Sequence, residues 1–97
     1  MTAYLTCNIT PGQFIGEWAV RGSAYDSTEF SLFVEDHDVD FDDTRPERTG
    51  LLRVEVLDQD ADRALVKLPV ATFEQGRTIT VDRTQIQVAH PALTHER

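Results

Sequence analysis

Residues 51–88 carry the pattern that most restricts what this chain can fold into. Leu52, Val54 and Val56 alternate with charged residues, which is the period-two pattern of a strand with one buried face. Similar short segments follow at 64–68, 79–81 and 86–88. Turn-forming residues, including glycine, separate them. The stretch therefore predicts four antiparallel strands joined by turns.

The first half of the sequence has the same character. Its candidate strands are 5–9, 18–21, 30–34 and 39–41. We therefore expect an all-β fold, a small antiparallel barrel or sandwich of about seven or eight short strands. No long helix is expected. A single helical turn bracketed by Pro69 and Gly76 is the only one that the sequence suggests, because proline suits the start of a helix and glycine its end.

The two halves resemble each other when residues 4–42 are shifted by 47 positions onto residues 51–89. The apolar positions that coincide include Leu5 with Leu52, Ile9 with Val56, Leu32 with Ile79 and Val34 with Val81. Around Trp18 the fit is better at a shift of 46, and a change of turn length or a bulge would absorb this slip. A chance likeness of two β meanders is the alternative. We favour an internal duplication, with a polar linker at 43–50.

Each of the two units has the strand spacing of an SH3-like or Tudor-like small barrel. This is a likeness of fold class, which carries no motif and transfers no function. With 97 residues in all, we expect one compact domain over 1–90 and a flexible tail over 91–97.

The chain is acidic, with 17 Asp and Glu against 9 Lys and Arg and a formal net charge of −8. Nucleic acids and anionic membranes would be repelled, since binding to either depends on cationic side chains. A basic protein surface is compatible with this charge, although acidity also serves solubility alone. No secretion signal or membrane-spanning apolar run is evident, and the single cysteine excludes an intrachain disulfide, so we expect a cytoplasmic protein.

The densest acidic segment is 35–43. Its carboxylates Asp36, Asp38, Asp40 and Asp42 offer a weak alternative as a calcium site, since calcium prefers oxygen ligands. On an extended chain all four would point to one side, which is typical of a solvated strand face. We favour the solvated face. The loop 58–62 opens like an EF-hand, but Arg63 and Pro69 occupy the positions that need Gly and Glu. No cofactor is expected.

No catalytic motif is present, so we expect a protein that is not an enzyme. Cys7 alternates with apolar residues and is expected to be a small buried hydrophobe. The three histidines, His37, His90 and His95, lie in no recognisable catalytic pattern.

Three apolar residues suggest a partner-binding surface. Phe14 and Ile15 occupy a glycine-bracketed loop, where capping of a barrel end is the commoner arrangement and contact with a partner is the alternative. Phe33 falls on the opposite face from Phe30 and Leu32, so it needs cover from the other β unit, a second copy or a partner. We therefore expect a non-catalytic protein–protein interaction or structural module that binds a protein or forms a homodimer. The alternatives are an acidic mimic of nucleic acid and a weak calcium-binding protein.

Overall fold

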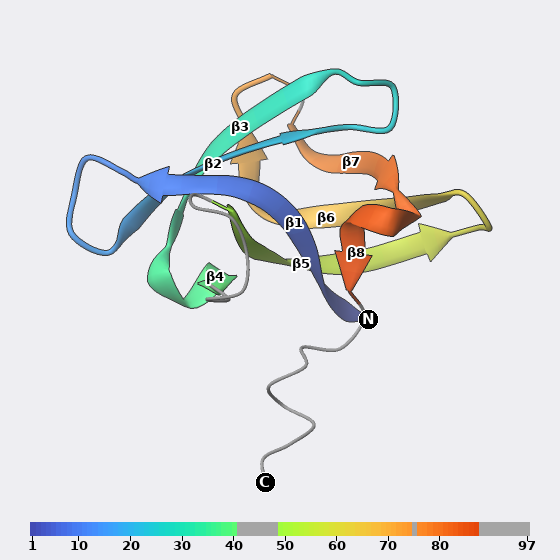
Figure 1. Ribbon diagram of the computed structural model, residues 1–97, viewed down its shortest axis with the longest axis horizontal. Coiled ribbons are helices and arrows are strands. Elements are labelled where there is room, and N and C mark those ends of the chain that lie inside the picture. Colours follow the sequence, from blue (N-terminus) through green and yellow to red (C-terminus); the bar gives the residue numbers. More distant parts are fainter. Residues whose placement is uncertain (41–48, 75, 88–97) are drawn as a thin grey trace, which may run out of the picture.

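The structure is a computed structural model that describes residues 1–40, 49–74 and 76–87. Eight strands form one antiparallel sheet, which curls into a half-barrel (Figure 1). The strands are β1 (Thr2–Pro11), β2 (Glu17–Ser23), β3 (Glu29–Glu35), β4 (Val39–Asp40), β5 (Thr49–Gln59), β6 (Arg63–Thr72), β7 (Gly76–Asp82) and β8 (Ile86–Gln87). The order across the sheet is β3-β2-β1-β5-β6-β7, with β4 on β5 and β8 on β1. The prediction of a small all-β fold is confirmed.

The concave side of the sheet holds the core, and the alternating residues of the sequence supply it. Leu5 of β1 lies opposite Leu52 of β5, and neither side chain is exposed. The other large, fully buried side chains of this core are Ile9, Val20, Phe30, Leu32, Val66, Leu68 and Val81. Cys7 is buried among them, as expected.

A glycine makes room for the largest core side chain. Gly22 of β2 pairs with Phe30 of β3, and the Phe30 ring lies over it. A Cβ at residue 22 would come within 2.6 Å of Phe30 Cζ, closer than any real contact. The aromatic ring therefore depends on a missing side chain in the neighbouring strand.

The elements of residues 29–40 recur 47 positions later. Adding 47 to the bounds of β3 gives those of β7, and the same step takes the 3-10 turn η1 (Asp36–Asp38) to η2 (Arg83–Gln85) and β4 to β8. The pairings recur as well. Val39 of β4 lies opposite Leu52, as Ile86 of β8 lies opposite Leu5. An origin by duplication stays a prediction.

Two local changes account for the slip from 47 to 46 around Trp18. The first hairpin closes on the pair Pro11 and Trp18, leaving residues 12–17 in the loop, whereas the second closes on Gln59 and Ala64, leaving 60–63. The second loop is thus two residues shorter. A bulge between Val56 and Asp58 adds one residue to β5, so the net difference is one.

Two expectations from the sequence are wrong in detail. The helical turn expected between Pro69 and Gly76 is not found among the residues described there, because β6 continues to Thr72 and β7 begins at Gly76; the described 3-10 turns are η1 and η2. The linker is shorter than 43–50, since Thr49 and Gly50 already belong to β5. Residues 43–48 and the expected tail at 91–97 lie outside the described residues.

The two end strands of the sheet are each bound by a turn from the other half. The β2–β3 turn reaches β7, where the N–H of Tyr25 donates to the C=O of Thr80 at 2.8 Å. The β6–β7 turn reaches β3, where the N–H of Phe73 donates to the C=O of Ser31 at 2.9 Å. These contacts turn an open sheet into a partly closed barrel with two seams, one where β3 faces β6 and one where the β2–β3 turn faces β7.

Candidate functional site

A depression of about 980 Å³ lies at the first seam, between the edge of β3 and β6. We call it the seam hollow. Its lining includes the apolar side chains Phe14, Ile15, Phe33 and Val70 and the cationic side chains Arg53 and Arg77. The three residues that the sequence suggests separately as partner-binding, in one loop and one strand, thus border the same surface feature. Their binding role stays a prediction.

The β1–β2 loop holds Phe14 and Ile15 outward because hydrogen bonds within the loop fix its main chain. Glu17 Oε1 accepts the N–H of Gln13 at 2.8 Å, and the N–H of Glu17 donates to the C=O of Phe14 at 3.0 Å. Gly16 has a φ of +84°, a left-handed conformation that suits glycine, and turns the chain into β2. Phe14 is 71% exposed and Ile15 is fully exposed. The expectation that they cap the barrel end is therefore wrong.

Phe33 lies on the convex face of β3, as the alternation predicts, and is 39% exposed. Its ring meets the edge of the Phe73 ring in a T-shaped arrangement, with centroids 5.7 Å apart and planes at 82°. Phe73 comes from the β6–β7 turn and is itself 71% exposed. The second half of the chain thus supplies only part of the cover that Phe33 needs.

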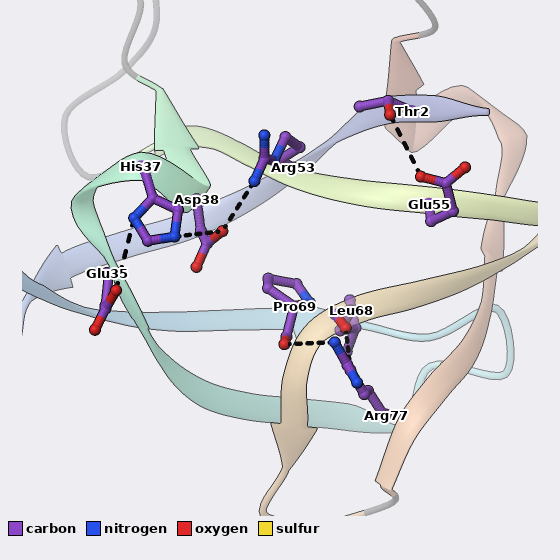
Figure 2. Close-up of polar contacts among 9 residues, drawn as sticks. All are labelled: Thr2, Glu35, His37, Asp38, Arg53, Glu55, Leu68, Pro69 and Arg77. Carbon is purple, nitrogen blue, oxygen red and sulfur yellow. Dashed lines mark hydrogen bonds and ion pairs between the residues drawn. The ribbon is translucent and has the colours of Figure 1, made fainter.

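The acidic turn η1 forms a polar wall of the seam hollow. Asp38 is buried, and its carboxylate lies 3.6 Å from both Arg53 Nη2 and His37 Nε2 (Figure 2). His37 Nδ1 lies 3.6 Å from Glu35 on the other side. These separations exceed a hydrogen bond, so the contacts are ion pairs or, for neutral His37, dipolar contacts. Asp38 and Arg53 join η1 to β5.

The expected solvated face at 36–42 is only partly correct. The 3-10 turn breaks the alternation, so Asp36 is exposed while Asp38 is buried and Asp40 half-buried. The indole Nε1–H of Trp18 donates a hydrogen bond to the Asp36 carboxylate. Within 1–40, 49–74 and 76–87, no group of three or more His, Cys, Asp or Glu side chains is placed to hold a metal ion. Asp42, the fourth candidate ligand, lies outside these residues.

On the β6 side of the seam hollow, Arg77 hydrogen-bonds to the main chain of β6 where the β6–β7 pairing is irregular. The β6–β7 pairing is regular up to Lys67 and Thr78 and shifts before Thr72 and Gly76. In this interval Arg77 Nε donates to the C=O of Leu68 at 2.7 Å, and Nη2 donates to the C=O of Pro69 at 2.9 Å (Figure 2). The guanidinium thereby donates hydrogen bonds to two carbonyl groups of β6 in the interval where the regular β6–β7 pairing is interrupted.

A second depression of about 300 Å³ continues from the seam hollow and shares Arg53, Pro69 and Arg77 with it. It adds Lys67 and Glu55 to the lining. The Thr2 hydroxyl donates to Glu55 Oε1 at 3.3 Å along its rim (Figure 2).

Sequence reasoning did not identify Val70, Arg53 and Arg77 as part of the seam hollow, nor Phe73 as the neighbour of Phe33. One signal was available for Phe73. At the shift of 47, Phe73 falls on Asp26, so an aromatic residue replaces an acidic one at equivalent turns. The expected helical turn over 69–76 concealed the contribution of Val70.

Cys7 is the one cysteine of the chain, and it lies away from the seam hollow in the core. Burial raises the pKa of its thiol to about 12, so the sulfur stays protonated at neutral pH and is a poor nucleophile. His90 and His95 lie outside the described residues.

Comparisons with protein-family models, curated proteins and solved structures return no match to this chain. In the part of the chain that the structure describes, no helix has the length and apolar character needed to cross a membrane.

Proposed function

We propose that this protein is a non-catalytic interaction module that binds a protein partner through the seam hollow. The observation that carries the proposal is the convergence of four exposed apolar side chains, Phe14, Ile15, Phe33 and Val70, around one depression. They come from three separate parts of the chain. Isolated exposed apolar residues are ordinary, whereas a contiguous group is typical of an interaction site.

The physical argument is the area that a partner would bury. A phenylalanine that moves from water into an interface buries about 150–250 Å², and aromatic anchors that fill pockets dominate binding energies. Phe14 is already held in an outward position by its loop, so little ordering would be needed when a partner binds.

The acidic mimic of nucleic acid is less well supported by these contacts. A mimic needs carboxylates that remain available across one surface at phosphate-like spacing. In the densest acidic segment, Asp36 accepts a hydrogen bond from Trp18 and Asp38 is buried beside Arg53. The apolar hollow, rather than the acidic segment, therefore guides our proposal.

An affinity capture with matched variants tests the proposal. The full chain, Ile15→Ser and Leu57→Ser are each used as bait in a lysate of the native host, and bound proteins are quantified by mass spectrometry. Leu57 is a matched control because it is 51% exposed and does not line the seam hollow. We expect a protein that is retained by the wild type and by Leu57→Ser and is lost with Ile15→Ser. Equal retention by all three baits would contradict the proposal.

A further inference from the structure

We propose that the seam hollow binds an extended segment of a second protein, which adds as a strand to the edge of β3 at Phe33 and Glu35 and carries apolar side chains beside Lys or Arg. This inference rests on the proposed function and specifies how the partner binds. It follows from the hydrogen-bonding edge of β3, from a difference between the two seams and from the charge of the site.

Among the described residues, the edge of β3 is covered at Ser31 and has no main-chain partner beyond it. The main chain of Ser31 faces away from β2, since its N–H donates to Glu74 Oε1 at 2.8 Å and its C=O accepts from Phe73. Because main-chain groups alternate along a strand, those of Phe33 and Glu35 face the same way. No described residue outside β2 bonds to them as Phe73 and Glu74 do to Ser31. This part of the edge offers donors and acceptors to an added strand.

At the other seam, the corresponding edge of β7 is hydrogen-bonded to the β2–β3 turn. Phe33 corresponds to Thr80 of β7 at the shift of 47, and the C=O of Thr80 accepts the N–H of Tyr25. Gln85 Nε2 also donates to the C=O of Ser23 at 3.2 Å across that seam. On β3 the equivalent turn stops at Ser31, two residues before Phe33. One seam is therefore bonded at the position that the other leaves open.

The two seams also differ in the residues at equivalent positions. Phe33 has Thr80 as its counterpart, and Phe73 has Asp26, both at the shift of 47. Two exposed aromatic side chains, Phe33 and Phe73, thus contact each other at the open seam, whereas the closed seam has polar residues at these two positions and carries one exposed aromatic side chain, Tyr25. The pair of exposed rings beside an open strand edge suits the binding of an apolar extended segment.

The charges favour a segment with cationic side chains. The seam hollow is lined by Glu17, Glu35, Asp36 and Asp38 against Arg53 and Arg77. Both arginines have partners within the chain, and the Glu35 carboxylate, although 3.6 Å from His37 Nδ1, is 79% exposed and accessible to a cationic side chain. The net charge of −8 adds long-range attraction for a basic segment.

A second copy of this chain fits the site poorly. Two β3 edges could pair only through Phe33 and Glu35, because Phe73 and Glu74 cover Ser31 in each copy. Two molecules with a charge of −8 also repel each other.

The test begins with a phage-displayed library of random decapeptides selected on the full chain. We expect peptides with alternating apolar residues and at least one Lys or Arg. Amide exchange is then measured by NMR with a saturating selected peptide. The amides of Phe33 and Glu35 should exchange at least about tenfold more slowly when peptide is bound, as expected when an exposed N–H gains a strand hydrogen bond. The amide of Thr78 on β7 lies outside the hollow and should not change.

Proline at the edge provides the second arm. Glu35 is extended, with φ −96° and ψ 166°, and its N–H faces outward, so Glu35→Pro removes a donor with a small change of backbone. Glu35→Ala removes the carboxylate alone, and Glu29→Pro places proline at the far end of the same strand. We expect Glu35→Pro to bind the peptide about tenfold more weakly than Glu35→Ala, and Glu29→Pro to bind like the wild type.

The outcomes separate the two proposals. If Ile15→Ser abolishes peptide binding while Glu35→Pro equals Glu35→Ala and no β3 amide is protected, strand addition is wrong and the binding hollow stands. Acidic selected peptides would overturn the cationic partner, and protection of the Phe33 amide by self-association would replace it with a second copy. If Ile15→Ser binds every selected peptide as the wild type does, and if it also retains every protein that the wild type captures from the lysate, the proposed function itself is wrong.

Discussion

Phe33 of β3 and Thr80 of β7 occupy equivalent positions in the two halves of the sheet, yet within residues 1–40, 49–74 and 76–87 only Thr80 of the two has its main chain bonded across a seam. The C=O of Thr80 accepts the N–H of Tyr25 at 2.8 Å, whereas Phe33 borders the seam hollow and contacts the exposed ring of Phe73. The same backbone plan thus has a main-chain bond at one seam, whereas at the other, among the described residues, two exposed rings meet without such a bond at Phe33.

The exposure of Phe33 predicts that it contributes little to stability. Phe33→Ser should lower the free energy of unfolding by about 1 kcal/mol, the value of one aromatic pair. Phe30→Ala should cost about 3–5 kcal/mol, because that ring is fully buried against Gly22. Urea denaturation followed by circular dichroism measures both. If Phe33→Ser unfolds the protein, Phe33 belongs to the core and the proposed interface is wrong.

The contact between Glu74 and Ser31 should weaken in acid. Hydrogen bonds from the Ser31 hydroxyl and N–H, at 2.7 and 2.8 Å, lower the pKa of Glu74 in the folded state. A carboxyl with a lowered folded pKa stabilises the fold above its unfolded pKa, and this contribution is lost as the pH falls through the folded value. The protection factor of the Ser31 amide should therefore decrease as the pH falls below the ordinary glutamate pKa of about 4.3.

The control for this effect is Glu74→Gln, which keeps an oxygen acceptor and does not titrate. Its Ser31 protection should be lower at neutral pH and should not show the acid-dependent step. An identical pH profile for the wild type and Glu74→Gln would show that Glu74 does not hold the turn.

Cys7 should be inert in the folded protein. Burial raises the pKa of its thiol from 9.0 to about 12, so the thiolate that reacts with a disulfide reagent is scarce at pH 8. Since the folded pKa is raised, the associated stabilisation is complete below pH 9.0 and is lost as the pH rises towards 12. We expect labelling by Ellman's reagent only after addition of denaturant. Rapid labelling of the native protein would contradict the burial of β1.

Calcium should leave the melting temperature unchanged. Asp38 is already buried beside Arg53, and Asp36 is held by Trp18, so their oxygens are not arranged around a common point. A ligand present at 100 times its dissociation constant stabilises a protein by about 2.7 kcal/mol, which shifts the melting temperature of a small domain by several degrees. A calcium-dependent rise that disappears in the Asp38→Asn, Asp40→Asn double variant would contradict this account.

The strands could be predicted because the sequence alternates wherever one face of the sheet is buried. Leu52, Val54 and Val56 are buried and Arg53 and Glu55 exposed, as the period-two pattern requires. The alternation also placed Phe33 on the outer face. These features depend on local periodicity, which is visible in a single sequence.

The assembly of the site depends on contacts that no local pattern records. Phe33 meets Phe73 because a turn from the second half reaches β3, 40 residues away in the chain. Arg77 lines the hollow because β6 and β7 lose register after Lys67, and the break exposes carbonyl groups. A sequence signal for either would require knowledge of how the two halves close.

Site-specific photocrosslinking tests the central claim most directly, namely that the seam hollow is a protein-binding site. Benzoylphenylalanine is introduced in place of Ile15 or, as the matched control, in place of Leu57, which is exposed outside the hollow. Each protein is irradiated in a lysate of the native host, and crosslinked peptides are mapped by mass spectrometry. We expect position 15 to crosslink one protein at one short segment and position 57 to leave that protein unmodified. Equal crosslinking from both positions, or none from position 15, would contradict the account.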